Sequence, residues 1–363
     1  MKRKDVNKFR GCLVGGAVGD ALGYPVEFKS IDEIKAAHGD AGITKYQCEG
    51  GEALVSYNTQ MAMFAAEGIM FGATHEFMRK KEEDRGSTLE YIEDYVFDSL
   101  LNWGKIQGYA GSGVEINHES WIIEENENLK ENRAADEHII ELMKEGKGGT
   151  ITEPVNQYKD GSCLTRVAPV AVFYDRDTEG ADGIAMAGAR VAALTNGHPF
   201  GYVSAAILAD LINRLIYCEY EAGSDALFGM VSEACDTAQR LFPDNAETKE
   251  VVNLISEAAA LARESDDDVA AVQKIGQGWD ANEALAIAVY CALKYKDSFE
   301  KGVLTAVNHS GNSETTGSLT GNILGAYLGL PKIPYTLNGI NLELKFVIQE
   351  LADDLYTGVI SPF

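Results

Sequence analysis

Apolar residues recur with helical spacing along most of the chain. Four segments combine this period with many Ala, Leu and Glu residues, which favour helices: 203–217, 226–242, 247–264 and 281–295. Segments that alternate apolar and polar residues, as half-buried strands do, are scarce. One segment, VAPVAVFY at 167–174, fits either a strand or the end of a helix. The pattern predicts an all-α fold in which the polar loops carry the chemistry.

No stretch of the chain has the length and polarity of a linker between domains. Residues 105–165 have the weakest periodicity and several glycines, and residues 264–270 form a short acidic segment. Both are too short or too apolar to separate two folding units. We therefore expect residues 1–363 to form one compact helical domain.

Glycine recurs at every fourth residue in two segments. The two sets are Gly11, Gly15, Gly19 and Gly23, and Gly317, Gly321, Gly325 and Gly329. A glycine inside a helix costs roughly 0.5–1 kcal/mol relative to alanine. Residues four apart share one helix face, so each set predicts a stripe without side chains against which another backbone packs. If these two helices pack together, the polar segments at their ends would meet at one place.

Oxygen-bearing side chains stand at the ends of three predicted helices. Glu27 follows the first glycine segment, SYNT at 56–59 precedes a long apolar run, and NSETT at 312–316 opens the second glycine segment. Ser, Thr and Asn are the preferred residues for capping a helix start. Carboxylate, hydroxyl and amide oxygens are also the ligands that Mg²⁺ and Mn²⁺ select. Capping and metal binding both remain open for these segments.

The charge of the chain excludes some classes of partner. The 363 residues carry a net charge of −25, with 45% hydrophobic and 24% charged residues, as is ordinary for a globular protein. Nucleic acids are not expected as partners, since binding them needs clustered Lys and Arg. No apolar run looks long enough to span a bilayer, so we expect no membrane partner.

The cysteines point to a reducing compartment. The six cysteines are scattered and lack the paired spacing of zinc sites. We interpret them as reduced thiols of the core, and the start of the chain lacks the apolar region of a secretory signal. The expected location is therefore cytoplasmic.

Six segments of the chain together resemble a known family. They are GCLVGGAVGDALGYPVEF, SYNTQMAMFAAEGI, GSCLTRVAPVAVFY, LTNGHPFGY, GQGWDANEALAIAVYCAL and NHSGNSETTGSLTGNILGAYLG. Over residues 8–330 the chain resembles the ADP-ribosylglycohydrolase family, in which these segments occur in the same order. The resemblance implies a compact, single-domain helical bundle with a cleft at one end. In this family the cleft holds two Mg²⁺ or Mn²⁺ ions beside ADP-ribose, and the glycosidic bond at C1″ is hydrolysed.

The chain departs from the family at the metal-ligand positions. The resemblance places these ligands at Glu27, Ser56, Tyr57, Asn58, Asn312, Glu314 and Thr315. The family has two aspartates where Tyr57 and Asn58 stand, and an aspartate at the position of Asn312. Only Glu27 and Glu314, the expected catalytic residues, remain as carboxylates. Because two divalent ions need more negative charge than this, we expect a degenerate site with at most one weakly held ion.

The resemblance and the cleft loops also indicate residues that contact the substrate. These are Gly113, Gly161, Ser162, Arg166, Asn196, His198, His309, Ser310 and Gly311. The alternative for Arg166 is a structural ion pair, and the alternative for the two histidines is a purely structural role.

The expected function is hydrolysis at C1″ of ADP-ribosylated substrates. The partner implied is ADP-ribose, or a protein or small molecule that carries it. The lost aspartates leave a second function open, namely a catalytically impaired protein that binds ADP-ribose or a related nucleotide, or serves as a scaffold.

Overall fold

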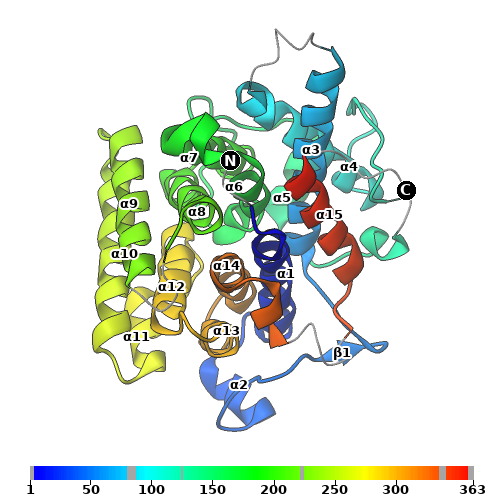
Figure 1. Ribbon diagram of the computed structural model, residues 1–363. Coiled ribbons are helices and arrows are strands. Elements are labelled where there is room, and N and C mark those ends of the chain that lie inside the picture. Colours follow the sequence, from blue (N-terminus) through cyan, green and yellow to red (C-terminus); the bar gives the residue numbers. More distant parts are fainter. Residues whose placement is uncertain (1–3, 80–86, 124–125, 221–224, 335–340, 359–363) are drawn as a thin grey trace.

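Two glycine-rich helices form the centre of the molecule. The computed structural model describes residues 4–79, 87–123, 126–220, 225–334 and 341–358. In it, α1 (Val6–Gly23) and α14 (Ser313–Leu328) lie side by side and antiparallel (Figure 1). They make the most extensive contact of any two described elements. Nearly every residue of α14 is buried, because other helices cover its remaining faces.

The glycine stripes of these two helices interlock backbone against backbone. A Cβ atom on Gly19 would lie 1.9 Å from the carbonyl oxygen of Gly317, and one on Gly15 would lie 2.3 Å from that of Gly321. Such distances leave no room for a side chain. The predicted close packing is therefore confirmed, and the end of α1 meets the start of α14 where a Cβ on Gly23 would lie 2.2 Å from the oxygen of Ser313.

The other helices surround this pair. They are α2 (Ile31–His38), α3 (Tyr57–Arg79), α4 (Ile92–Ile106), α5 (Glu137–Glu145), α6 (Ala168–Phe173), α7 (Arg176–Ala193), α8 (Pro199–Tyr217), α9 (Ala226–Leu241), α10 (Ala246–Glu264), α11 (Asp268–Ile275), α12 (Ala281–Lys294), α13 (Phe299–Val307) and α15 (Lys345–Thr357). In Figure 1, α9 and α10 form the outer edge on one side, while α3, α4 and α15 lie on the other. Buried apolar side chains from these helices form one continuous cluster.

Short elements complete the described chain. They are the 3₁₀ turns η1 (Tyr24–Val26), η3 (Thr88–Tyr91), η4 (Glu127–Lys130), η5 (Gly161–Leu164) and η6 (Leu330–Lys332), and the strands β1 (Cys48–Glu49) and β2 (Glu52–Ala53). The two strands pair as a small antiparallel hairpin. The all-α prediction is confirmed, and the ambiguous segment at 167–174 is the helix α6.

Two sequence-based expectations need correction. We expected no apolar segment long enough to cross a membrane, but α8 has the length and composition to do so. Of its most apolar 18-residue stretch, 89% is buried inside the protein, as in the core helix of a soluble protein. The six cysteines are free as expected, but Cys48 is exposed and Cys218 is only partly buried, so these two are not core thiols.

Candidate functional site

A cleft opens where the ends of the central helices meet. Its volume is about 480 Å³. Its walls are formed by Glu27, Phe28, Tyr57, Asp136, Glu137, His138, Tyr158, Lys159, Asp160, Trp279, Asp280, Asn312 and Glu314. The interlocked glycines fix this place, because they bring the end of α1 and the start of α14 together.

Helix caps position the polar residues at the cleft. Ser56 precedes α3, and its Oγ accepts a hydrogen bond of 3.1 Å from the backbone N–H of Asn58. Asn312 precedes α14, and its Oδ1 accepts a bond of 3.0 Å from the N–H of Thr315. Both residues therefore satisfy amides that a helix start leaves without partners. The capping interpretation is confirmed for Ser56 and Asn312, which lie at or beside the cleft.

The carboxyl groups of Glu27 and Glu314 are close neighbours in the cleft. Burial raises the pKa of Glu27 to about 8. Burial and the neighbouring charge of Glu27 raise the pKa of Glu314 well above its ordinary value. Two such close carboxyl groups cannot both ionise easily, so the pair holds a proton near neutral pH.

Tyr57 and Asn58, which replace the expected aspartates, are both occupied by hydrogen bonds. Tyr57 is buried, and its hydroxyl donates to Asp136 Oδ2 at 2.6 Å. The amide of Asn58 donates from Nδ2 to Glu314 Oε1 at 2.7 Å, and its Oδ1 accepts from the hydroxyl of Thr165 at 3.1 Å. Asn58 thus presents an N–H donor to the carboxylate that a metal ion would need.

These contacts do not fit the pair of divalent ions that the family resemblance implies. The pair of Glu27 and Glu314 keeps a proton near neutral pH because both pKa values are raised, and Asn58 directs its amide nitrogen at Glu314. Thr315 Oγ1 and Glu314 Oε2 are buried without a hydrogen-bond partner among the described residues, but a neutral hydroxyl and one oxygen of a carboxyl pair that keeps a proton do not offset four positive charges. We therefore route no chemical step through a dinuclear centre at these positions.

The η5 turn lies directly behind the cleft. A Cβ on Gly161 would lie 3.0 Å from Thr315 Cγ2, which places this turn against the start of α14. Ser162 accepts a bond of 3.2 Å at its carbonyl oxygen from the fully buried guanidinium of Arg166, which also donates to Thr195 Oγ1 at 3.1 Å. Burial lowers the pKa of Arg166 from its ordinary value. Arg166 thus supports the turn from inside the protein.

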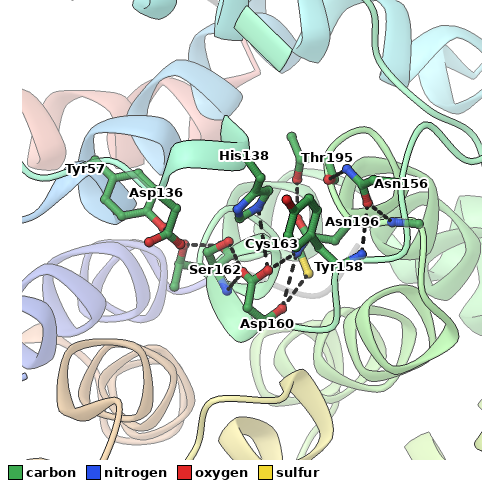
Figure 2. A network of polar contacts seen from close by, with 12 residues as sticks. Tyr57, Asp136, His138, Asn156, Tyr158, Asp160, Ser162, Cys163, Thr195 and Asn196 are labelled. Atoms are coloured by element: carbon green, nitrogen blue, oxygen red, sulfur yellow. Dashed lines mark hydrogen bonds and ion pairs between the residues drawn. The ribbon is translucent and has the colours of Figure 1, made fainter. Parts of the chain in front are cut away.

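Asn196 joins the same network. It is fully buried, and its Nδ2 donates to Asp160 Oδ2 at 2.7 Å (Figure 2). Its contact with a ligand remains a prediction, but its present role is to orient Asp160 at the cleft wall.

Three other predicted substrate-binding residues are not part of the cleft lining and form hydrogen bonds elsewhere. His198 caps α8, where its Nδ1 accepts from the N–H of Phe200 at 3.1 Å. His309 is buried, pairs with Thr316 Oγ1 at 2.9 Å, and has its pKa lowered to about 4 by burial. Ser310 Oγ accepts from the N–H of Ile31 at 2.9 Å.

The two remaining glycines also lie apart from the cleft lining. A Cβ on Gly311, which has φ of 140°, would lie 2.0 Å from the carbonyl oxygen of Gln277, so this position needs glycine for packing. Gly113 is exposed, and a Cβ there would meet no atom within 4 Å. Contact with substrate stays a prediction for both.

Sequence reasoning missed a cluster of ligand-type side chains on the cleft wall. Asp136, His138 and Asp160 each offer one ligand atom, and these three atoms lie within 4.8 Å of one another (Figure 2). The D-x-H spacing at 136–138 was a readable signal, but it lies in the region of weakest periodicity. The position of Asp160 next to Gly161 was a second signal.

An aromatic pair at the edge of the cleft was also missed. The rings of Phe28 and Trp279 stack with their centroids 5.2 Å apart. Phe28 is 73% exposed and has φ of 63°, in the left-handed region that a bulky residue seldom adopts. Both residues belong to the lining of the cleft.

Comparisons with known proteins find similar sequences and a similar fold. The family model described as ADP-ribosylglycohydrolase matches residues 1–362. ADP-ribosylhydrolase ARH3 of Homo sapiens is 22% identical, with 91% of this chain and 88% of that protein covered. An uncharacterized protein of Archaeoglobus fulgidus is 26% identical, with 96% of each covered. A solved structure of an ADP-ribosylglycohydrolase-related protein complex shares the fold, with a TM-score of 0.59 at 20% identity over 97% of this chain and 98% of that one.

Proposed function

Because the chain belongs to the ADP-ribosylglycohydrolase family, we propose that it hydrolyses the C1″ glycosidic bond of an ADP-ribosylated substrate. The observation that carries this proposal is the close carboxyl pair of Glu27 and Glu314 in the lining of the cleft. The stacked rings of Phe28 and Trp279 support it, because a flat aromatic face suits a nucleotide base.

The carboxyl pair can supply both proton transfers of the reaction. Since the pair holds one proton near neutral pH, one carboxylate accepts a proton from the attacking water while the carboxyl group donates its proton to the leaving atom. The water oxygen bonds to C1″ as the bond from C1″ to the leaving atom breaks. The products are ADP-ribose and the released side chain or small molecule. Buried Arg166 and the η5 turn hold the wall of the cleft in place.

A specific contact favours a second candidate, namely a protein that binds ADP-ribose without turnover. Asn58 donates its amide to Glu314, and Tyr57 occupies the position of another family aspartate. These contacts engage Tyr57, Asn58 and one oxygen of Glu314 without an ion. Such a protein retains the cleft and its aromatic edge but lacks hydrolytic activity.

The experiment measures release of ADP-ribose from peptides carrying ADP-ribosylated arginine or serine. The protein should release ADP-ribose, and Glu27→Gln should slow the release by about 100-fold or more, since a general acid–base contributes about 10²–10⁴. Glu264→Gln removes the same charge from the exposed end of α10 and should leave the rate unchanged. Calorimetry with ADP-ribose runs in parallel.

The outcomes separate the two candidates. Release that depends on Glu27 supports the hydrolase. Binding of ADP-ribose without release at high protein concentration rejects the hydrolase and supports the binding protein. Neither binding nor release rejects both.

A further inference from the structure

The cleft wall carries a set of possible metal ligands that is separate from the family's metal-ligand positions. Asp136 precedes α5, His138 lies in the first turn of that helix, and Asp160 precedes η5. Figure 2 shows these side chains approaching one another across the gap between the two segments. None of the three occupies a metal-ligand position of the family, although Asp136 accepts a hydrogen bond from Tyr57, which does.

His138 is the unexplained member of the cluster. It is only 7% exposed, and its Nε2 is buried with no hydrogen-bond partner among the described residues. The atom lies 3.5 Å from Asp160 Oδ2, an ion-pair distance without hydrogen-bond geometry. Burying a polar atom without a hydrogen-bond partner is unfavourable, so this imidazole nitrogen is available to bind a ligand.

Neighbouring groups hold each of the three side chains in position. The ring of His138 stacks on Tyr158 with centroids 4.3 Å apart. Asp136 Oδ2 accepts from the hydroxyl of Tyr57, and Asp160 Oδ2 accepts from Asn196 Nδ2. In addition, Asp136 forms no side-chain cap on α5, although it stands at the capping position. Such outer contacts are what orient the ligands of a metal ion.

We propose that Asp136, His138 and Asp160 bind one divalent transition-metal ion, such as Zn²⁺ or Mn²⁺. One imidazole nitrogen with two carboxylate oxygens suits these ions, whereas Mg²⁺ prefers oxygen ligands alone. With metal–ligand distances of about 2.1 Å, ligand atoms stand about 3–4.2 Å apart, so the present spread of up to 4.8 Å needs only small side-chain movements. Three protein ligands leave further positions of the ion open to a ligand in the cleft.

The site also explains the charge of the cleft. Its lining contains the acidic residues Glu27, Asp136, Glu137, Asp160, Asp280 and Glu314, against the basic residue Lys159. An anionic ligand entering this cleft meets mainly negative charge. A cation at the Asp136–His138–Asp160 cluster supplies the missing positive partner. The proposal rests on the cluster itself and holds whether or not the protein hydrolyses its ligand.

Metal titration of the chelator-treated protein tests this proposal directly. By calorimetry, Zn²⁺ or Mn²⁺ should bind at one ion per chain and at least about tenfold more tightly than Mg²⁺. His138→Gln and Asp160→Asn should each weaken this binding at least about tenfold. Co²⁺ should give a visible absorption band in the unmodified protein, and His138→Gln should change that band.

Two matched controls locate the ion. His38→Gln removes a histidine of α2 that does not line the cleft. Glu314→Gln removes one of the two carboxylates that remain at the family's metal-ligand positions. Both variants should keep the transition-metal affinity. Circular dichroism first checks that each variant folds. Zn²⁺ should then raise the melting temperature of the unmodified protein and of both controls, but not that of His138→Gln or Asp160→Asn.

Three results would overturn the proposal. The first is no saturable binding of either ion below about 1 mM, which corresponds to a binding free energy weaker than about −4 kcal/mol. The second is binding that His138→Gln and Asp160→Asn leave intact. The third is binding that Glu314→Gln abolishes while His138→Gln does not, since the ion would then occupy the family's position. If His138→Gln fails to fold, Asp160→Asn decides between these outcomes.

Discussion

Replacing Gly19 by alanine tests whether backbone contact between α1 and α14 organises the protein. The new Cβ would lie 1.9 Å from the carbonyl oxygen of Gly317 and 2.3 Å from its carbonyl carbon, whereas real Cβ atoms essentially never come closer than 3.0 Å. The helices must therefore separate locally by at least 3.0 − 1.9 = 1.1 Å. Neither partner is a side chain that can rotate away.

The expected loss of stability follows from these contacts. Forcing an extra carbon into a well-packed core costs about 1–3 kcal/mol, and a rigid backbone neighbour places Gly19→Ala at the upper end. Alanine returns about 0.5–1 kcal/mol through its better helix propensity. The net expectation is a loss of about 2 kcal/mol or more in the free energy of unfolding.

A second glycine provides the matched control. Gly229 lies inside α9, is exposed, and would place its Cβ within 4 Å of no other atom. Gly229→Ala should therefore raise the free energy of unfolding by about 0.5–1 kcal/mol through helix propensity alone. Urea denaturation followed by circular dichroism measures both variants. If Gly19→Ala proves as stable as Gly229→Ala, the central contact is looser than the structure shows, and the reasoning fails.

Two further predictions concern the cleft. The pKa of Glu27 is 4.5 in the unfolded chain and about 8 in the folded protein. The resulting stabilisation is therefore fully present below pH 4.5 and is lost as the pH rises through about 8. It amounts to at most about 5 kcal/mol, at about 1.4 kcal/mol per pKa unit. Urea denaturation from pH 5 to pH 9 should therefore show a steeper loss for the unmodified protein than for Glu27→Gln, and parallel curves would contradict the assignment. Burial raises the pKa of Asp136, and the hydrogen bond from the Tyr57 hydroxyl opposes this rise. Tyr57→Phe removes that hydroxyl, so the free energy of unfolding should fall by about 1–3 kcal/mol. The loss should be larger at pH 8 than at pH 5, because the hydrogen bond favours the ionised carboxylate. An equal loss at both pH values would show that Asp136 does not sense this hydroxyl.

Local sequence pattern was enough to predict the scaffold. The four-residue glycine period specified a close helix contact, because spacing along a helix fixes which residues share a face. Of the two alternatives left open for the polar residues at helix starts, capping is confirmed at Ser56 and Asn312. These features depend on residues a few positions apart, and a single sequence contains that information.

The cleft wall could not be predicted in the same way. Asp136 and Asp160 are separated by 24 positions and reach each other only through tertiary packing of loops that have no periodic pattern. The engagement of Asn58 with Glu314 spans 256 positions. Family resemblance identified those two positions but not their mutual hydrogen bond, since that bond exists only with the residues found in this chain.

The contact between α1 and α14 also separates what holds the protein together from what reacts. Glycine carries no functional group, so the interlocked stripes fix the location of the cleft without contributing a single reactive atom to it. Substitutions at Tyr57, Asn58 or Asn312 can consequently change the chemistry while the framework persists. A scaffold of this kind offers a protein engineer a cleft whose lining can be redesigned while the eight glycine positions are left untouched.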